Sequence, residues 1–297
     1  MISNKNSSCL LSVLLALLST LTFARHPELT PPEPPPIGNF SLPAAQEPGP
    51  FISFGENIIE KNELQLFLSP SYEKNQQEYF WQVTQELLYG LSDRASILLS
   101  LPVAVRYQSE GMRSSGFGDL GLQGEYAIYE QADLKKETQA TLVGAVIFPT
   151  GSNSKIPPTG NGSPGIFAGA TFNQTFVNWL WFASPALIYV VPKGNNQVGT
   201  QYLYQMGIGR IISAKSGQYI FSSLLECNGE YTEKDKIGGV PDPNSGGNII
   251  LLTPSLWYSN THLTLQLGVS LPVSQRLNGE QNQNDYTLTA TVAWLFS

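Results

Sequence analysis

The sequence of 297 residues contains few charged residues, cysteines, histidines and methionines. Charged residues make up 13% of it, about half the share found in a typical soluble domain. Two cysteines and two histidines provide little material for a metal site, a cofactor site or a disulfide framework, and we expect none of these. The net charge is −7 and no run of lysine and arginine is present, which excludes nucleic acid as a partner because phosphate binding needs clustered cations.

The N-terminus has the features of a secretory signal peptide. Lys5 supplies positive charge, and the apolar stretch Cys9–Phe23 is shorter than the ~20 residues of a membrane-spanning helix, which disfavours a membrane anchor. Small residues at Thr22 and Ala24 predict a signal peptide over residues 1–24, cleaved after Ala24. Cleavage removes Cys9 and leaves Cys227 without a partner for an intramolecular disulfide.

From Asn62 onward, apolar residues recur at every second position. In THLTLQLGVSLPVS (Thr261–Ser274), leucine or valine alternates with Thr, Gln, Gly and Ser. RASILLSLPVAVRY (Arg94–Tyr107) and QYIFSSLLECNGEY (Gln218–Tyr231) alternate in the same way. A period of two predicts strands with one apolar and one polar face. Twelve candidate strands lie near residues 62–70, 78–90, 94–107, 118–130, 138–149, 165–176, 179–192, 200–212, 218–232, 247–258, 261–273 and 284–296.

Short and long connections alternate between these segments. LSDR (Leu91–Arg94) and SNTH (Ser259–His262) are short, whereas PTGSNSKIPPTGNGSPG (Pro149–Gly165) is long and rich in Gly, Pro, Asn and Ser. This alternation is typical of an up-and-down meander across a membrane, with tight periplasmic turns and long outer loops. The predicted fold is all-β: a transmembrane antiparallel β-barrel of about 12 strands over residues 62–297, in contact with outer-membrane lipid.

The closing segment DYTLTATVAWLF (Asp285–Phe296) fits this interpretation. A sheet can cross lipid only if it closes, so the last strand must pair with the first. Its aromatic residues also resemble the terminal signal recognised by the outer-membrane assembly machinery; the candidates are Tyr286, Trp294 and Phe296. The alternative is a secreted β-sandwich or lipocalin-like barrel. It is disfavoured because charged residues share a face with the small residues expected of a crowded lumen.

Two segments precede the predicted barrel. Residues 25–50 are rich in proline and are expected to form an extended, flexible linker, acting as a spacer rather than a docking peptide. The sequence leaves two places open for residues 51–61, which begin with FISFGENII (Phe51–Ile59): a plug inside the lumen, or the periplasm.

Four motifs resemble a known family in order and spacing. GFGDL (Gly116–Leu120) is similar to the family's Gly-x-Gly-Asp entry into a strand, and FPTGS (Phe148–Ser152) to its Pro-Thr-Gly at the mouth of a long loop. LSDR and the closing strand also match. This is the "MetA-pathway of phenol degradation" family of bacterial outer-membrane proteins, and the resemblance covers Asn62 to the end. It implies an outer-membrane barrel with a loose link to the uptake of small aromatic or apolar compounds.

An enzymatic role is disfavoured. Outer-membrane barrels that are lipases or proteases need a nucleophile with a general base, usually histidine. His26 lies at the leader boundary and His262 in a turn, and neither is placed beside a serine and an acid.

Candidate functional residues are those predicted to face the lumen. They are Gln82, Glu86, Arg106, Gln123, Glu125, Glu226, Asn228, Glu230 and Gln266. Acidic residues outnumber basic ones, so an open pore would favour cations or neutral solutes. A closed lumen, with Arg106 neutralising a carboxylate, is equally compatible with the sequence. Two functions therefore stay open: a passive channel for small solutes, or a sealed structural or surface-recognition barrel that acts through its outer loops.

Overall fold

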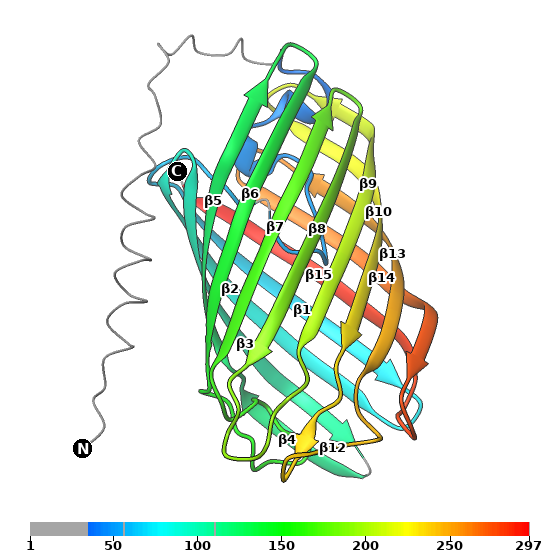
Figure 1. Ribbon diagram of the computed structural model, residues 1–297. Helices are drawn as coiled ribbons and strands as arrows, with labels where there is room; N and C mark the ends of the chain where they lie inside the picture. Colours follow the sequence, from blue (N-terminus) through cyan, green and yellow to red (C-terminus); the bar gives the residue numbers. More distant parts are fainter. Residues whose placement is uncertain (1–34, 56, 110, 297) are drawn as a thin grey trace, which may run out of the picture. The chain divides into compact units, whose positions relative to one another are not determined.

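Strands account for nearly all of the regular structure. The computed structural model describes residues 35–55, 57–109 and 111–296 (Figure 1). Two short 3-10 helices, η1 (Gly38–Ser41) and η2 (Ala44–Gln46), come first. No helix within these ranges has the length and apolar character needed to cross a membrane. The predicted signal peptide, residues 1–24, lies outside the described residues, as do residues 25–34.

The strands run up and down in chain order. They are β1 (Leu64–Asn75), β2 (Tyr79–Ser92), β3 (Ala95–Ser109), β4 (Met112–Phe117), β5 (Leu120–Ala132), β6 (Lys136–Phe148), β7 (Gly165–Phe176), β8 (Trp179–Val190), β9 (Gln201–Lys215), β10 (Tyr219–Thr232), β11 (Lys236–Ile237), β12 (Val240–Pro241), β13 (Gly247–Ser259), β14 (Leu263–Leu277) and β15 (Asn284–Phe296).

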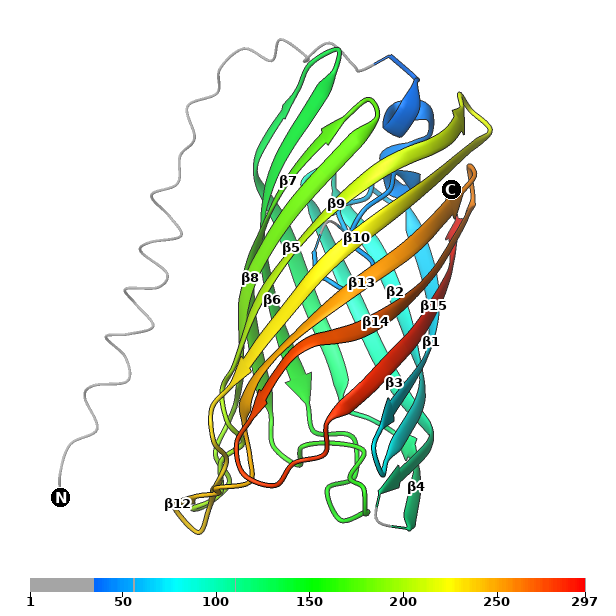
Figure 2. The ribbon, with the colours of Figure 1, turned by 90° about the vertical axis from the view of Figure 1, so that its right-hand side faces the viewer.

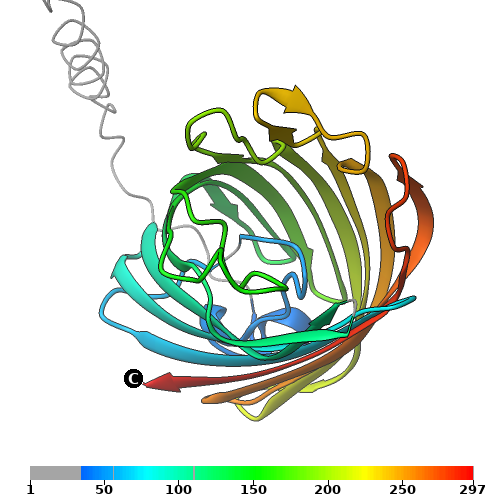
Figure 3. The same cartoon turned by 90° about the horizontal axis from the view of Figure 1, so that it is seen from below.

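Thirteen of these strands form one closed antiparallel sheet. β1 pairs with β2 on one side and with β15 on the other, where one register runs from Leu64 opposite Phe296 to Lys74 opposite Tyr286. β4 and β5 follow one another along β3, so the barrel has twelve strand positions. The remaining pair, β11 and β12, forms a small hairpin in the connection between β10 and β13. Figure 3 shows the strands as a ring around the N-terminal segment. Closure leaves the sheet without a free edge, as lipid requires.

Apolar side chains project outward from alternate positions, as the period of two predicts. On β14, Leu265, Leu267 and Leu271 are exposed, while Thr264, Gly268 and Ser270, at the alternate positions, are buried inside the barrel. The exposed aromatics Trp294 and Phe296 lie at the C-terminal end of β15. The outer face therefore suits hydrocarbon and the inner face is polar, the reverse of a soluble barrel.

The predicted strands match the structure in number and position, and the differences concern the outer loops. The strand predicted at 118–130 is continued on the loop side by β4, after an interruption at Gly118 and Asp119. The small hairpin β11–β12 was not predicted, because two-residue strands are too short to show alternation.

The described part of the predicted linker is packed rather than extended. Residues 35–50 contain η1 and η2, and Phe40, Leu42 and Gln46 are buried. They lie at the end of the barrel that carries the short connections, here called the turn end (Figure 2). The opposite end, with the long connections, is the loop end. The prediction of a flexible linker up to Pro50 is therefore wrong for this part, because the barrel offers partners that a proline-rich sequence cannot reveal.

We predict that a charge on the outer face destabilises the barrel. Leu267→Arg should lower the free energy of unfolding by about 2–4 kcal/mol, because it places a cation in hydrocarbon. Denaturant titration of the protein folded into phospholipid vesicles measures this. Val240→Arg, in the exposed hairpin strand β12, is the matched control and should change stability by no more than about 0.5 kcal/mol. Equal effects of the two substitutions would contradict the assignment of the outer face.

Candidate functional site

The N-terminal segment enters the barrel and fills part of its lumen. We call residues 35–55 and 57–61 the plug. At the turn end, the Asn39 side-chain amide donates to the carbonyl oxygens of Phe176 (2.7 Å) and Trp179 (3.1 Å). Deeper inside, Thr264 Oγ1 donates to Gln46 Oε1 at 2.7 Å and Ser259 Oγ donates to the Gln46 carbonyl oxygen at 2.7 Å. Residues 51–55 and 57–59 lie in the lumen, where Phe51, Asn57 and Ile59 bond to Glu226, Glu125 and Ser96; this is one of the two places that the sequence left open.

The carboxylate of Glu226 on β10 is the central attachment point of the plug. It accepts hydrogen bonds from three consecutive backbone N–H groups, those of Phe51 (2.5 Å), Ile52 (3.1 Å) and Ser53 (3.0 Å). Ser53 Oγ donates to the same carboxylate at 2.9 Å. Glu226 is completely buried, so a negative charge there requires donors of this kind. The plug backbone supplies them in place of a basic side chain.

A second carboxylate holds the other arm of the plug. Glu125 on β5 accepts from the Asn57 backbone N–H (3.0 Å) and from the Asn57 side-chain amide (2.7 Å). Gln123 Nε2 donates to the same carboxylate at 2.7 Å. Beyond it, the Ile59 N–H donates to Ser96 Oγ at 3.2 Å, and Ile59 packs with Leu88 and Leu98 of the wall.

Phe54 of the plug packs on β7, which lies between β5 and β10 in the barrel wall. Its ring meets Phe167 of β7 edge-on with ring centroids 4.9 Å apart. A side chain on Gly169 would come within 2.7 Å of the Phe54 ring, so this position requires glycine. The plug therefore contacts β5, β7 and β10, which are widely separated around the ring.

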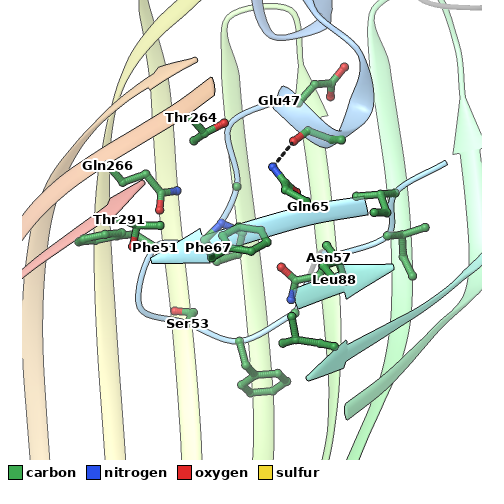
Figure 4. A pocket seen from close by; sticks show the side chains of 18 of the residues that line it. Glu47, Phe51, Ser53, Asn57, Gln65, Phe67, Leu88, Thr264, Gln266 and Thr291 are labelled. Carbon is green, nitrogen blue, oxygen red and sulfur yellow. Dashed lines mark hydrogen bonds between the residues drawn. The ribbon is translucent and has the colours of Figure 1, made fainter. Parts of the chain in front are cut away.

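Between the plug and the wall lies a cavity of about 330 Å³. Figure 4 shows Phe51, Ser53 and Asn57 of the plug facing Gln65, Phe67 and Leu88 on one side and Thr264, Gln266 and Thr291 on the other. Glu86, Gln123 and Glu137 also line it. Polar and aromatic side chains converge there from most of the ring, as expected of a solute-binding space.

The structure places the predicted lumen residues as follows. Glu125, Glu226 and Asn228 contact the plug, with Asn228 Oδ1 accepting from Ser53 Oγ at 2.8 Å. Glu86, Gln123 and Gln266 line the cavity. Two others lie nearer the loop end: Gln82 accepts from the Tyr107 hydroxyl at 2.6 Å, and Glu230 accepts from Thr232 Oγ1 at 2.8 Å.

Arg106 is the exception and lies on the outer face. It stands opposite Trp81, whose side chain is exposed, and its guanidinium lies 5.2 Å from the centre of the Tyr79 ring. A register shift between β2 and β3 leaves Val105 unpaired, which moves Arg106 from the inner to the outer face. The prediction that Arg106 neutralises a lumen carboxylate is therefore corrected.

Several lumen residues were not among the predicted candidates. Gln205 on β9 accepts from the Phe54 N–H at 3.2 Å, and Glu137 on β6 and Asn173 on β7 line the cavity. Alternation along KETQATLVG (Lys136–Gly144) could have identified Glu137, because it shares a face with buried Val143.

The predicted assembly residues occupy both ends of β15. Trp294 and Phe296 lie near the turn end, whereas Tyr286 lies near the loop end, with its ring 6.4 Å from that of Tyr72. The role of the three residues in assembly stays a prediction.

Two of the sequence motifs meet at the loop end. Asp119 of GFGDL accepts from the N–H groups of Gly151 (2.9 Å) and Asn161 (2.7 Å). Thr150 of FPTGS donates to the Gly118 carbonyl oxygen (2.9 Å) and accepts from the Leu120 N–H (2.9 Å). The loop between β6 and β7 is thereby held across the loop-end opening (Figure 3). Substituting Gly151 or Gly160 would bring a side chain to within 2.9 Å or 2.2 Å of Asp119, which explains both glycines.

Comparison with solved structures identifies the type of fold. No family model and no curated protein matches this chain. Among solved structures, the COG4313 outer membrane channel from Pseudomonas putida F1 is similar, with a TM-score of 0.69 and 13% identity over 84% of this chain and 100% of that one. CdiB from Escherichia coli (TM-score 0.42, 9% identity, covering 80% and 63%) and the CymD monoaromatic hydrocarbon channel (0.38, 10%, covering 88% and 97%) are more distant.

By fold, the chain is a β-barrel of the bacterial outer-membrane type. Its lumen is partly occupied by its own N-terminal segment.

We predict that Glu226 controls how firmly the plug is held. Glu226→Gln should lower the free energy of local opening by about 2 kcal/mol, because it removes the charge that three N–H groups share. Hydrogen exchange at Phe51–Ser53, followed by mass spectrometry, should become roughly 30-fold faster. Glu230→Gln, on the same face of β10 but without plug contacts, is the control. Unchanged exchange in Glu226→Gln would show that the plug is held elsewhere.

Proposed function

We propose that the protein is a passive outer-membrane channel for small solutes, closed at rest by the plug. The observation that carries this proposal is the attachment of the plug to buried side chains of the wall, above all Glu226. A barrel of twelve positions is wider than the eight-stranded size that side chains alone fill. The polar inner face then becomes a path for solute once the plug withdraws.

The hydrogen bonds that hold the plug favour reversible closure. They link backbone donors to carboxylates, and water can replace each of them when the plug moves. Residues 51–55 and 57–59 combine these hydrogen bonds with apolar contacts of Ile59 with Leu88 and Leu98 and of Phe54 with Phe167, whereas Phe40 and Leu42 are buried nearer the turn end. The part of the plug attached to Glu226 and Glu125 can therefore open locally without unfolding the barrel.

Membership of the MetA-pathway family is part of this proposal. It is supported by the meeting of GFGDL with FPTGS around Asp119 and Thr150, and by the fold shared with the COG4313 channel. On this basis the solutes are small apolar or aromatic compounds, and the protein is not an enzyme.

The charge of the lumen defines which ions an open pore would pass. The inner face of the described strands carries seven glutamates; these are Glu73, Glu86, Glu125, Glu130, Glu137, Glu226 and Glu230. Lysines and arginines of these strands lie outside or at strand ends, as Arg106 and Arg210 illustrate, each stacked on an outer aromatic ring. Apart from Arg94 of the β2–β3 turn, whose Nε lies 3.8 Å from the Glu130 carboxylate, the described strands line an open pore with acidic groups that have no basic counterparts.

We predict that removing the plug opens the pore. Mature protein lacking the residues before Asn62 should give steady single-channel currents in planar bilayers, whereas the full mature chain should be closed most of the time. Glu226→Gln, which keeps the whole chain, should lengthen the open periods. A folded, heat-modifiable barrel that carries no current without its plug would reject the channel in favour of a sealed barrel acting through its loops.

We also predict that the plug-free pore prefers cations. Under a potassium chloride gradient, its reversal potential should lie toward the potassium equilibrium potential, because acidic linings concentrate cations. Glu73→Gln combined with Glu230→Gln should move the reversal potential toward zero. Glu280→Gln, in an outer loop, is the control and should leave it unchanged. A preference for chloride in the unsubstituted pore would contradict this assignment.

A further inference from the structure

The cavity beside the plug has an unusual charge balance. Two glutamates of the wall, Glu86 and Glu137, line it, and among the described residues its lining includes no lysine, arginine or histidine. An anionic ligand would meet carboxylates without a counter-charge, which is strongly unfavourable in a space shielded from water. The cavity therefore excludes anions and favours a cation.

One wall of the cavity carries four polar side chains in a compact group. Glu137 on β6 stands opposite Thr175 on β7, and Gln139 stands opposite Asn173 one step further along the same face. All four line the cavity. Directly opposed and diagonal residues of neighbouring strands lie within reach of one another and of one ligand group. We call these residues the polar tetrad.

Asn173 gives an independent indication of a ligand. Its side chain is 3% exposed, and neither its amide oxygen nor its amide nitrogen has a hydrogen-bond partner among the described residues. Buried amides are normally satisfied, so an unpartnered one that lines a cavity points to a group that binds there. Beside Glu137, the amide oxygen of Asn173 is suited to accept from an N–H donor.

Other parts of the lining are apolar and aromatic. Phe51 of the plug and Phe67 and Trp257 of the wall line the cavity together with Leu88 and Leu98. Aromatic faces attract cations and also bury an apolar body. The lining therefore combines an acidic, amide-rich side with a hydrophobic side.

We propose that this cavity binds a small organic cation, an ammonium group attached to an apolar or aromatic body. The ammonium donates to the carboxylate of Glu137 and to the amide oxygens of Asn173 and Gln139. The body occupies the space between Phe51, Phe67 and Trp257. This proposal rests on the proposed channel function and deepens it, since it names the solute class held beside the closed plug.

Calorimetric titration of the full mature protein in detergent tests the proposal with three probes of one size. Benzylamine should bind measurably, whereas benzyl alcohol and benzoate should bind at least tenfold more weakly, because each lacks the ammonium charge. Glu137→Gln should weaken benzylamine binding about ten- to hundredfold. Glu230→Gln, a lumen glutamate that does not line the cavity, should leave it unchanged.

Asn173→Leu, nearly equal in volume, provides a second variant and should also weaken benzylamine binding. Equal binding of the three probes, no benzylamine binding by the folded wild-type protein, or unaltered binding in Glu137→Gln would overturn the proposal. The titration needs no current, so it is independent of the bilayer result: binding to a barrel that never conducts would uphold this site while rejecting the channel.

Discussion

Hydrocarbon contains no water to satisfy a backbone N–H or C=O group, and the rest of the structure depends on this constraint. It forces the sheet to close through β1 and β15. Closure gives the sheet an outer face that must be apolar and an inner face that need not be. The polar residues of every strand are thereby directed into one narrow space. Seven glutamates of the described strands lie in that space, and each must be solvated, neutralised or given donors.

The plug is one solution to this problem. Glu226 and Glu125 receive donors from the backbone at Phe51–Ser53 and at Asn57 rather than from lysine or arginine. A backbone donor carries no net charge, so the lumen keeps its negative potential while its buried carboxylates are satisfied. In the proposed channel, Glu226 and Glu125 would hold the plug in the closed state and add to the acidic lining of an open pore. Glu137 and Asn173 belong to the proposed ligand site.

The sequence predicts the barrel well, because alternation along a strand reports directly on the two environments at its sides. Leu265 and Leu267 on β14, and Glu226 and Asn228 on β10, lie on the faces that the pattern indicates. Prediction fails where the period breaks. The unpaired Val105 reverses the faces of β3, so Arg106 points outward, and no local signal marks that bulge.

The plug could not be predicted in the same way. In residues 35–55 and 57–61 the structure has no strand and two short 3-10 helices, so their place is set by distant partners such as Phe176, Glu226 and Glu125. The proline content of the first part suggested an extended chain, whereas the barrel holds it through Asn39 and Gln46. Likewise, GFGDL and FPTGS are separate motifs in the sequence. Only the structure shows that Asp119 of the first motif accepts hydrogen bonds from the N–H groups of Gly151, in the second motif, and of Asn161 further along the same loop.

Pulsed electron–electron double resonance between two spin labels tests most directly whether the plug lies inside the barrel. One label replaces Ile58 of the plug and the other replaces Tyr126, on the outer face of β5 next to Glu125, with Cys227→Ser removing the native thiol. The structure predicts a single narrow, short distance distribution in lipid vesicles, because Asn57, next to Ile58, is hydrogen-bonded to Glu125 on the inner face of β5. A broad distribution extending to distances longer than the barrel is wide would contradict it.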